Sequence, residues 1–300
     1  PTVVAEVLRK LTGPRPVEAP RHILPVGARL GRYRIKGLLG WGGYGAVYLS
    51  THPTLGIPVA IKTVPTTGLA RDLFRREARL QATIHHPTVV RVWDFEDEDE
   101  IACLVLEYVA GESLRDRLDD GPLSLEIAFR MVAQATLGLR AAHRMGVTHH
   151  DVKPANLFGT AEGGYKLGDF GLARCGIAIT HITRVDAPPA SLPLGTPNYM
   201  APEQFQVGAD HRADIYSLGL TLYHALSGVM PVPGDDVQDI MLRHQRGNIP
   251  PLAEVAMGLP AGVVEIVRQM TMADPDRRIS NYDDLLDGLT EAFGLRLVVI

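Results

Sequence analysis

The stretch THHDVKPANLF, residues 148–158, holds side chains that suit phosphoryl transfer. Asp151 could accept the proton of a hydroxyl group, or orient that hydroxyl for in-line attack. Lys153 could neutralise the moving phosphoryl group, where charge develops and electrostatics supply much of the rate. Asn156 and Asp169 offer oxygen ligands for Mg²⁺, a hard cation usually held by few protein groups plus phosphate oxygens. A single loop aspartate could equally make turn hydrogen bonds, so the interpretation depends on the rest of the chain.

A glycine-rich stretch, LGWGGYGAVY at residues 39–48, places Gly40, Gly42 and Gly45 in a G-x-G-x-x-G-x-V pattern. Glycine lacks Cβ, so the backbone can turn sharply and come close to phosphate. The stretch lies between two strand-like segments and not between a strand and a helix. This context argues against a dinucleotide-binding fold and favours a flap over nucleotide phosphates. A purely structural glycine hairpin remains the alternative.

Lys62 lies in the apolar stretch VAIK, residues 59–62. An ammonium group is costly to bury without an anion. Glu77, on the helix that we expect next, could pair with Lys62, and together they could hold the α- and β-phosphates of a nucleotide. Taken alone, Lys62 could equally be a surface lysine at a strand edge.

The elements that must position these groups change in type along the chain. Short apolar runs broken by glycine, proline or charge predict strands at residues 33–40, 45–52, 58–64 and 101–109. Helical spacing of apolar residues predicts helices at residues 124–146, 212–228, 237–247, 261–271 and 282–293. A small β-rich part followed by a larger helical part favours two lobes of one α+β unit.

Two further segments carry weaker signals. Residues 70–86 predict a helix with one apolar face, formed by Leu73, Phe74, Ala78 and Leu80. The acidic run DFEDEDE, residues 94–100, predicts a solvated hairpin tip between two strands, because like charges repel and need water.

The N-terminal residues differ from the rest. Residues 3–11 have helical spacing, and residues 12–27 are rich in proline and turn residues. We expect a short helix and an extended linker, either as a partly ordered arm or as a segment that docks on a lobe or a partner.

Composition narrows the class of protein. The 300 residues are 46% apolar and 21% charged, which is typical of a soluble globular protein, and the net charge of −4 gives no case for nucleic-acid binding. The two cysteines offer neither a zinc-site spacing nor a disulfide framework, so we expect a cytoplasmic location. No apolar run is long enough to span a bilayer. Because the chain begins at Pro1, a membrane anchor or further domains could lie outside it.

The order of the motifs resembles that of a eukaryotic-like protein serine/threonine kinase, with bacterial kinases the most similar in character. The resemblance covers residues 31–293 and follows the family's order: the glycine-rich loop, VAIK, Glu77, HHDVKPAN at 149–156, DFG at 169–171, APE at 201–203 and DIYSLG at 214–219. It implies a bilobal protein kinase fold, with a β-rich lobe at 31–109, a helical lobe at 110–293, an N-terminal extension at 1–30 and a tail at 294–300.

The resemblance also implies roles for individual residues. The implied catalytic residues are Asp151, Lys153, Asn156, Lys62, Glu77 and Thr196. The implied nucleotide-binding residues are Leu39, Gly40, Gly42, Gly43, Gly45, Val47, Ala60, Lys62, Leu106, Glu107, Val109, Phe158 and Asp169. The implied structural and regulatory residues are His149, His150, Phe170, Gly171, Glu203, Asp214 and Arg278. ATP and Mg²⁺ are the implied cofactors, with Mn²⁺ as an alternative, and the implied partners are protein substrates and a homodimer through the small lobe.

Four of these roles concern the adenine ring. By the family pattern LEYV, Glu107 and Val109 present a backbone carbonyl and amide to the adenine edge, with Leu106 behind them. Phe158 is expected to form the apolar floor beneath the ring.

Further expected contacts support the architecture. The family pattern predicts that Thr196 links Asp151 to Lys153 through its hydroxyl group. Glu203 is expected to pair with Arg278. Asp214 is likewise expected to brace the backbone around His149. The sequence GTPNYMAPE, residues 195–203, and Pro154 after Lys153 are similar to the serine/threonine subclass.

The chain departs from the family pattern in two places. His150 stands where an arginine commonly pairs with a phosphorylated loop residue, and neutral histidine cannot form that fork. We therefore expect little dependence on loop phosphorylation, although His150 could simply fill space. The candidate phosphorylation sites in the loop are Thr180, Thr183 and Ser191. Gln81 falls where relatives place an apolar residue against Phe170, and a buried amide there must find hydrogen-bond partners.

Three function classes remain to be distinguished. The favoured one is an ATP-dependent protein serine/threonine kinase that also phosphorylates itself. The second is a pseudokinase or scaffolding module that binds nucleotide without catalysis, which is disfavoured because every residue required for catalysis is present. The third is a small-molecule kinase, which would not need the APE motif and its anchoring to Arg278.

Overall fold

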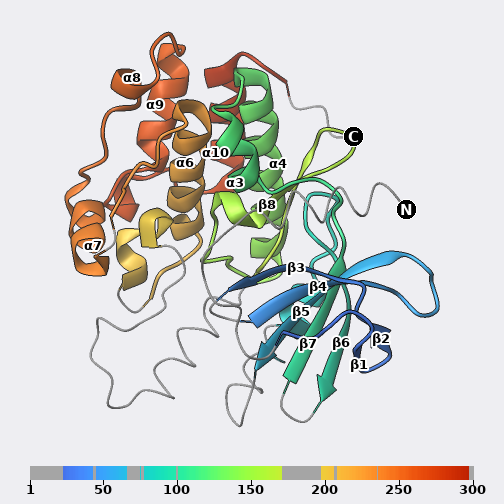
Figure 1. The fold of residues 1–300 in the computed structure, drawn as a ribbon. Coiled ribbons are helices and arrows are strands. Elements are labelled where there is room, and N and C mark those ends of the chain that lie inside the picture. Colours follow the sequence, from blue (N-terminus) through green and yellow to red (C-terminus); the bar gives the residue numbers. More distant parts are fainter. Residues whose placement is uncertain are drawn as a thin grey trace. The chain divides into compact units, whose positions relative to one another are not determined.

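The computed structural model describes residues 23–42, 45–65, 75, 78–98, 101–170, 197–205, 208–234 and 236–296. The chain divides into two compact units. Unit 1 contains Pro1–Ala82 and Arg91–Tyr108, and unit 2 contains Thr83–Val90 and Val109–Ile300. Figure 1 labels the strands β1–β7, which belong to unit 1, and the helices α3, α4 and α6–α10, which belong to unit 2.

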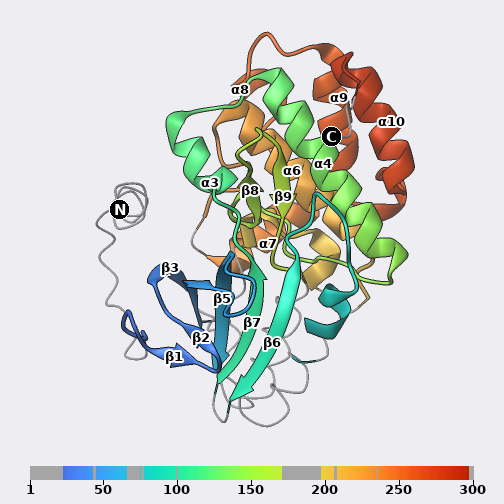
Figure 2. The ribbon, with the colours of Figure 1, turned by 90° about the vertical axis from the view of Figure 1, so that its right-hand side faces the viewer.

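Unit 1 is built around a five-stranded antiparallel sheet with the strand order β3-β4-β5-β7-β6. Its strands are β3 (Gly37–Gly42), β4 (Gly45–Thr51), β5 (Pro58–Pro65), β6 (Val92–Glu98) and β7 (Ile101–Glu107). A two-stranded ribbon of β1 (Arg29–Leu30) and β2 (Tyr33–Arg34) precedes it. In Figure 2 the strands β5, β7 and β6 run side by side.

One face of this sheet carries the apolar core of unit 1. The core contains Leu30, Tyr33, Ile35, Ala46, Tyr48, Val59, Ile61, Cys103 and Val105. Residues of the expected N-terminal linker also take part, because Ile23 and Leu24 pack against this core and the Leu24 N–H donates to the Tyr48 hydroxyl at 3.0 Å. Residues 23–30 therefore pack on unit 1, which agrees with the alternative of a segment that docks on a lobe.

The strands of unit 1 differ from the prediction in two places. The single strand expected at residues 33–40 is interrupted at Ile35 and Lys36, between β2 and β3. The acidic run at 94–100 is not only a hairpin tip, since most of it lies within β6. β6 is an edge strand, and Arg32 pairs with Asp94 and Glu96. Opposite charges from a neighbouring segment thus make an acidic strand tolerable, and charge on an edge strand also discourages pairing with other chains.

The apolar helix face predicted between β5 and β6 is wrong in one residue. Residues 78–82 are helical, and Ala78 is buried as expected. Leu80 is instead 36% exposed, whereas Gln81 is only 3% exposed. Residues three apart share a helix face, so the buried side carries Ala78 and Gln81. Leu73 and Phe74 lie outside the described residues.

Unit 2 is mainly helical. Its helices are α3 (Leu114–Arg117), α4 (Leu125–Arg144), α6 (Arg212–Ser227), α7 (Val237–Arg246), α8 (Leu252–Val255), α9 (Ala261–Met270) and α10 (Tyr282–Phe293). Its 3₁₀ segments are η1 (Leu118–Asp120), η2 (Pro154–Asn156), η4 (Pro197–Tyr199), η5 (Pro202–Phe205) and η6 (Pro275–Arg277). The five helices predicted from spacing are confirmed with nearly the expected ends.

Local sequence explains where these helices begin and end. The Ser124 hydroxyl accepts the Ile127 N–H at the start of α4, and Asn281 caps α10 in the same manner. Such caps satisfy backbone donors that have no partner within the helix. At the end of α6, Gly228 adopts a left-handed conformation with φ of 69°, which a residue with a Cβ would adopt only under strain.

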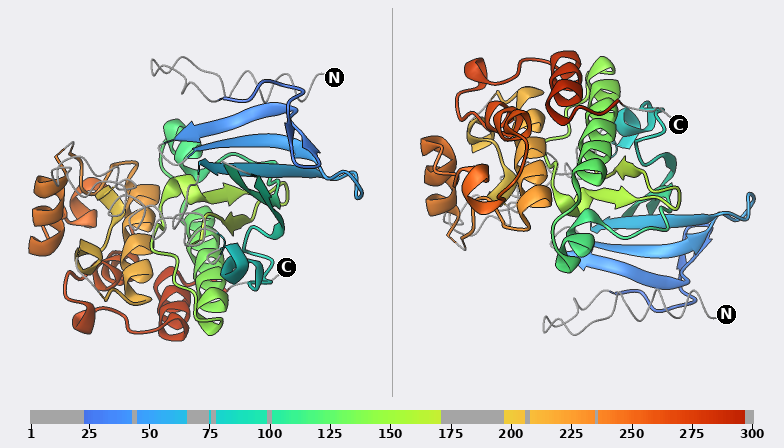
Figure 3. Two further views of the ribbon diagram at one scale, coloured as in Figure 1. Left: turned by 90° about the horizontal axis from the view of Figure 1, so that it is seen from below. Right: turned by 90° about the horizontal axis from the view of Figure 1, so that it is seen from above.

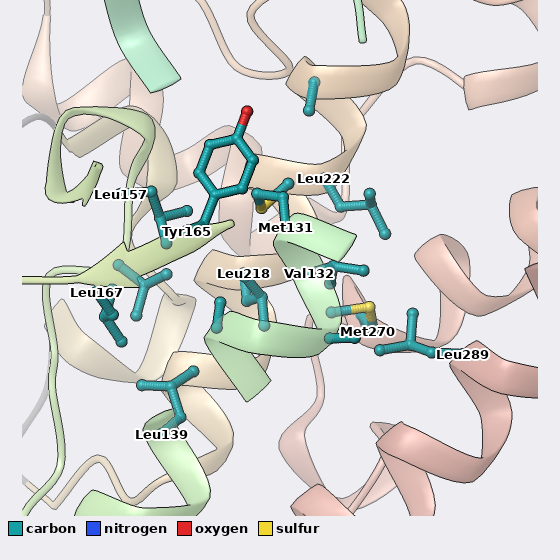
Figure 4. Packing of buried hydrophobic residues seen from close by; sticks show 14 of the residues in the cluster. Met131, Val132, Leu139, Leu157, Tyr165, Leu167, Leu218, Leu222, Met270 and Leu289 are labelled. Atoms are coloured by element: carbon teal, nitrogen blue, oxygen red, sulfur yellow. The ribbon is translucent and has the colours of Figure 1, made fainter. Parts of the chain in front are cut away.

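The core of unit 2 forms where α4, α6, α9 and α10 pack together. α6 is apolar nearly all round, and it is buried over most of its length because α4 and α9 both contact it. Figure 4 shows the centre of this core, where Met131, Leu218, Met270 and Leu289 come from these four helices.

A short hairpin, β8 (Leu157–Gly159) with β9 (Tyr165–Leu167), packs on α4 and adds Leu157 and Leu167 to the core (Figures 3 and 4). Residues 83–90, predicted in the first lobe, belong to this unit instead. The reason is a pair of backbone hydrogen bonds, from Val90 N to Leu167 O and from Leu167 N to Thr88 O.

Candidate active site

The centre of the candidate site is a cluster of three side chains between α4 and β8. The Lys153 Nζ donates to both carboxylate oxygens of Asp151, at 3.0 and 2.8 Å. The Asn156 Nδ2 donates to the carbonyl oxygen of Asp151 at 2.8 Å and to its carboxylate at 3.1 Å. The side chains of Asp151 and Lys153 are 21% and 16% exposed, so solvent and a ligand can reach them. The structure thus brings together three of the residues expected to carry the chemistry.

The backbone just before Asp151 is held in an unusual conformation. His150 has a φ of 62°, in the left-handed region, which costs a residue other than glycine roughly 1 kcal/mol or more. The buried carboxylate of Asp214, from α6, accepts the N–H groups of His149 at 2.8 Å and of His150 at 2.7 Å. Such a conformation persists only where the surroundings enforce it. Asp214 therefore shapes the loop that presents Asp151.

Burial has a large effect on Asp214 itself. The side chain is 1% exposed, and desolvation raises the pKa of its carboxyl group to about 7, although the two backbone donors oppose this rise. A carboxylate that accepts two N–H groups is the form that fits the observed loop.

His149 joins this loop to the segment after β9. Its Nδ1 lies 3.2 Å from the Asp151 N–H and its Nε2 lies 2.8 Å from the Gly168 carbonyl oxygen. An N–H needs an acceptor and a carbonyl needs a donor, so the ring is neutral with its proton on Nε2. Burial lowers the pKa of His149, in agreement with the neutral ring. The Phe170 ring packs against it at 4.5 Å between ring centroids.

The β8–β9 hairpin brings Asn156 close to Asp169. Leu157 pairs with Leu167, and the next step of the ladder is the hydrogen bond from Gly168 N to Asn156 O at 2.9 Å. Asn156 therefore directly precedes β8 and lies beside Gly168, where the chain leaves β9. Asp169 follows Gly168 and has a φ of 60°. Two oxygen-bearing side chains thus lie at one end of the hairpin.

This pair fits the requirements of Mg²⁺. The Asn156 Nδ2 already donates to Asp151, so its Oδ1 is the atom suited to a cation. Over the described ranges, no three or more His, Cys, Asp or Glu side chains gather into a metal site. Mg²⁺ needs no such cage, because one or two protein oxygens suffice when phosphate and water complete the octahedron.

An ion pair fixes η5, the 3₁₀ segment that contains Glu203. Arg278 donates to both carboxylate oxygens of Glu203, at 2.6 and 3.1 Å. The same guanidinium donates to the carbonyl oxygens of Met272, Arg212 and Ala273. Its side chain is fully buried, and every donor group of the guanidinium has a partner.

In unit 1, one face of the sheet gathers the residues expected to bind nucleotide. Successive side chains of a strand alternate between faces, and Ala46, Tyr48, Val59, Ile61, Cys103 and Val105 point to the core. The opposite face therefore carries Val47, Ala60, Lys62 and Leu106. Strand register supports this, since Lys62 is the partner of Val47 and Ala60 is the partner of Leu106.

The described glycines of the glycine-rich stretch lie in the paired strands β3 and β4. Gly40 pairs with Val47 and Gly42 pairs with Gly45, whose φ of 132° requires glycine. Leu39 lies in β3 next to the bulge between Leu38 and Gly40.

Three residues expected at the adenine ring remain: Glu107 ends β7, Val109 follows it by two residues, and Phe158 is in β8. The Glu107 N–H donates to the Arg91 carbonyl oxygen at 2.8 Å, within unit 1, whereas Val109 belongs to unit 2. Phe158 lies in β8, where its ring is so close to Gly168 that a Cβ on this glycine would be 2.9 Å from it. Several predicted residues lie outside the described residues: Gly43, Glu77, Gly171, Thr180, Thr183, Ser191 and Thr196.

Two glutamine residues, Gln204 and Gln81, have surroundings that the sequence motifs do not describe. Gln204, which the sequence analysis did not single out, donates to the His150 carbonyl oxygen at 2.8 Å, and no local pattern announces such a contact. The unusual polarity of Gln81 was noticed, and neither atom of its buried amide has a hydrogen-bond partner in the part of the chain that the structure describes.

Comparisons with known proteins agree with this geometry. The family model described as "Protein kinase domain" matches residues 33–289. The serine/threonine-protein kinase pkn2 of Myxococcus xanthus is 38% identical over 276 residues, which are 87% of this chain and 32% of that protein. The serine/threonine-protein kinase PrkC of Bacillus subtilis (strain 168) is 33% identical over 278 residues, 89% of this chain and 42% of that protein.

The serine/threonine-protein kinase PknB of Mycobacterium leprae (strain TN) is 35% identical over 258 residues, 82% of this chain and 40% of that protein. The chain therefore spans roughly a third to two fifths of the length of these relatives. Within the described residues, no helix is both long enough and apolar enough to cross a membrane.

Proposed function

The chain belongs to the protein kinase domain family, and we propose that it transfers the γ-phosphate of ATP to serine and threonine hydroxyls of proteins, including its own. The family and the α+β kinase fold predicted from the order of the motifs are thereby confirmed. The observation that best supports an active enzyme is the cluster around Asp151, in which Lys153 and Asn156 each donate to the Asp151 carboxylate.

In the proposed transfer, the substrate hydroxyl binds at the Asp151 carboxylate, which orients it and takes up its proton. The hydroxyl oxygen attacks the γ-phosphorus, and the bond to the bridging β–γ oxygen breaks, so ADP leaves. Lys153, already at the carboxylate of Asp151, offsets the charge that develops on the phosphoryl group. Lys62 is proposed to hold the α- and β-phosphates together with Glu77.

Protein kinases use ATP together with a divalent metal ion. We propose Mg²⁺ here, with Mn²⁺ as an alternative, held through Asn156 and Asp169. When bound, such an ion would shield the negative charge of the phosphates. Because alanine offers no oxygen ligand, Asp169→Ala should weaken the effect of added Mg²⁺ on nucleotide affinity.

Radiolabel transfer from ATP tests the proposal directly. The wild type should label itself and a generic basic protein, and Asp151→Asn should lower the rate by about 10²–10⁴-fold, the usual range for loss of a general base. Nucleotide binding without transfer by the wild type would instead indicate a pseudokinase. Transfer to a metabolite but to no protein would indicate a small-molecule kinase. Phosphoproteomics with the wild type and Asp151→Asn would then identify the protein substrates.

We further propose that His150 removes strong dependence on phosphorylation of the loop. The backbone of His150 is held by Asp214 and Gln204, so the shape of the catalytic loop has support that needs no phosphate. Phosphatase-treated enzyme should therefore be within a few-fold of autophosphorylated enzyme. Mass spectrometry after incubation with Mg-ATP would show whether Thr180, Thr183 or Ser191 is modified, and a large activation by such a phosphate would contradict the proposal.

Location and assembly are also proposals. We propose a cytoplasmic kinase domain that pairs through the small lobe, because the composition fits a reducing compartment and the family pattern implies such pairing. Sedimentation at increasing protein concentration would test the dimer.

A further inference from the structure

The side-chain amide of Gln204 joins two backbone segments of unit 2. Its Oε1 accepts the Ala201 N–H at 2.9 Å, and its Nε2 donates to the His150 carbonyl oxygen at 2.8 Å. The partners fix the orientation of the amide, because the N–H requires an acceptor and the carbonyl requires a donor. The two ends of one side chain therefore serve two different segments.

The segment reached by the Nε2 lies next to the candidate base. The His150 carbonyl belongs to the peptide group whose nitrogen is that of Asp151. On the other side of His150, the N–H is held by Asp214. Both polar backbone groups of this left-handed residue are thus held by side chains from outside its loop, one from α6 and one from η5.

The segment that carries Gln204 is itself anchored. The preceding residue, Glu203, pairs with the fully buried guanidinium of Arg278. A contact from Gln204 to His150 therefore transmits a fixed position to the catalytic loop. A side chain from a mobile surface segment could not do so, because its own motion would be passed on.

We propose that Gln204 is a positioning residue for the transfer: its Nε2 holds the peptide between His150 and Asp151 and so sets the direction of the Asp151 carboxylate. The proposal rests on the kinase activity proposed above and goes beyond it, since Gln204 lies outside the motifs that carry the resemblance to the family. Gln204 touches neither the carboxylate of Asp151 nor any atom that reacts, and it acts through the backbone.

Substitution with glutamate separates the two ends of the amide. Gln204→Glu keeps an oxygen that accepts the Ala201 N–H, but it loses the donor and places a second oxygen against the His150 carbonyl. Gln204→Ala loses both contacts. If the amide served only to hold Ala201, Gln204→Glu would behave like the wild type.

The expected result is a lower kcat for both variants with saturating ATP and a generic basic protein. Leaving the His150 carbonyl without its donor should lower kcat at least about fivefold. The KM for ATP should stay within twofold, because the contact lies in the protein loop and not on nucleotide.

Gln134→Glu is the matched control. Gln134 is also half-buried, and its Oε1 accepts a backbone N–H, that of Tyr165, at 2.6 Å. The substitution makes the same chemical change away from Asp151, so kcat should stay within twofold of the wild type.

Hydrogen–deuterium exchange of the peptide that contains residues 149–151 gives a second readout that needs no turnover. Exchange should be faster in Gln204→Glu and Gln204→Ala than in the wild type, and unchanged in Gln134→Glu. If the wild type transfers phosphate, an undiminished kcat in Gln204→Glu overturns the role of Gln204. If the wild type transfers no phosphate, the proposed activity fails, and the contact of Gln204 is then judged by hydrogen–deuterium exchange. Unchanged exchange in Gln204→Glu would show that the contact does not hold the loop, and faster exchange would support the contact.

Discussion

Replacing Arg278 with methionine should destabilise the protein strongly, because the substitution leaves several buried acceptors without a donor. The guanidinium makes five hydrogen bonds, to both carboxylate oxygens of Glu203 and to three backbone carbonyls. Its side chain is 0% exposed and that of Glu203 is 18% exposed. Removing one partner of a buried ion pair typically costs about 3–5 kcal/mol, since the remaining charge stays desolvated.

This loss of stability can be compared with that expected for an exposed ion pair with the same distance between nitrogen and oxygen. Arg268 and Glu265, on α9, also approach to 2.6 Å, but their side chains are 55% and 47% exposed. Surface pairs contribute roughly 0–1 kcal/mol because water screens them and both side chains lose freedom. The expected cost of Arg268→Met is therefore below about 1 kcal/mol, despite the same distance between the charged atoms.

Thermal unfolding of the wild type and the two variants is the assay. At about 2 °C per kcal/mol for a chain of this size, Arg278→Met should lower Tm by about 6–10 °C. Arg268→Met should lower it by about 2 °C or less. Arg278→Lys should lie closer to Arg278→Met than to the wild type, because one ammonium group cannot reproduce five fixed donors. If the two methionine variants lose the same stability, burial does not set the strength of the Glu203 pair and the reasoning is wrong.

Three other perturbations have expected outcomes. His244 is buried, its Nε2 faces the Pro197 carbonyl oxygen at 3.0 Å, and burial lowers its pKa from 6.5 to about 4. The unfolded chain therefore binds more protons between these pH values, so the free energy of unfolding should fall by up to about 3 kcal/mol as pH drops from 6.5 to 4. The Tm of His244→Gln should fall less than that of the wild type over this pH range. Gln81→Leu should raise Tm, because the buried amide has no hydrogen-bond partner among the described residues and its desolvation costs about 1–3 kcal/mol. Unchanged basal activity and nucleotide affinity would show that the amide does not loosen this helix. Asp236→Ala should lower the stability of α7 by about 1 kcal/mol, because its carboxylate accepts two N–H groups at the helix start; urea unfolding with an unchanged midpoint would contradict this.

The helices of unit 2 could be predicted from the sequence because their signals are local. The apolar spacing at 282–293 and the capping residues Asn281 and Gly294 lie within one short stretch, and α10 has the predicted limits. The strands of unit 1 were harder to predict from the sequence. The acidic composition of β6 favours solvent, and only its pairing with β7 and with Arg32 makes it a strand.

The buried face of the short helix at residues 78–82 was also difficult to predict from hydrophobicity. Leu80 and Gln81 are adjacent, and hydrophobicity alone assigns the burial to leucine. The turn of the helix assigns it to glutamine, because Gln81 shares a face with Ala78. The family pattern indicated a buried position for Gln81, but hydrophobic spacing within the chain did not.

The sequence by itself determined the family, the order of the motifs and the residue types that the chemistry needs, since these depend on side-chain identity and spacing. The tertiary structure decided how the groups are held. Asp151 is presented by a left-handed residue whose N–H and carbonyl are bound by Asp214 and Gln204, far along the chain. The resemblance to the family predicted a contact of Asp214 with this loop. No motif indicates the contact of Gln204, because contacts between residues so distant in sequence arise from packing.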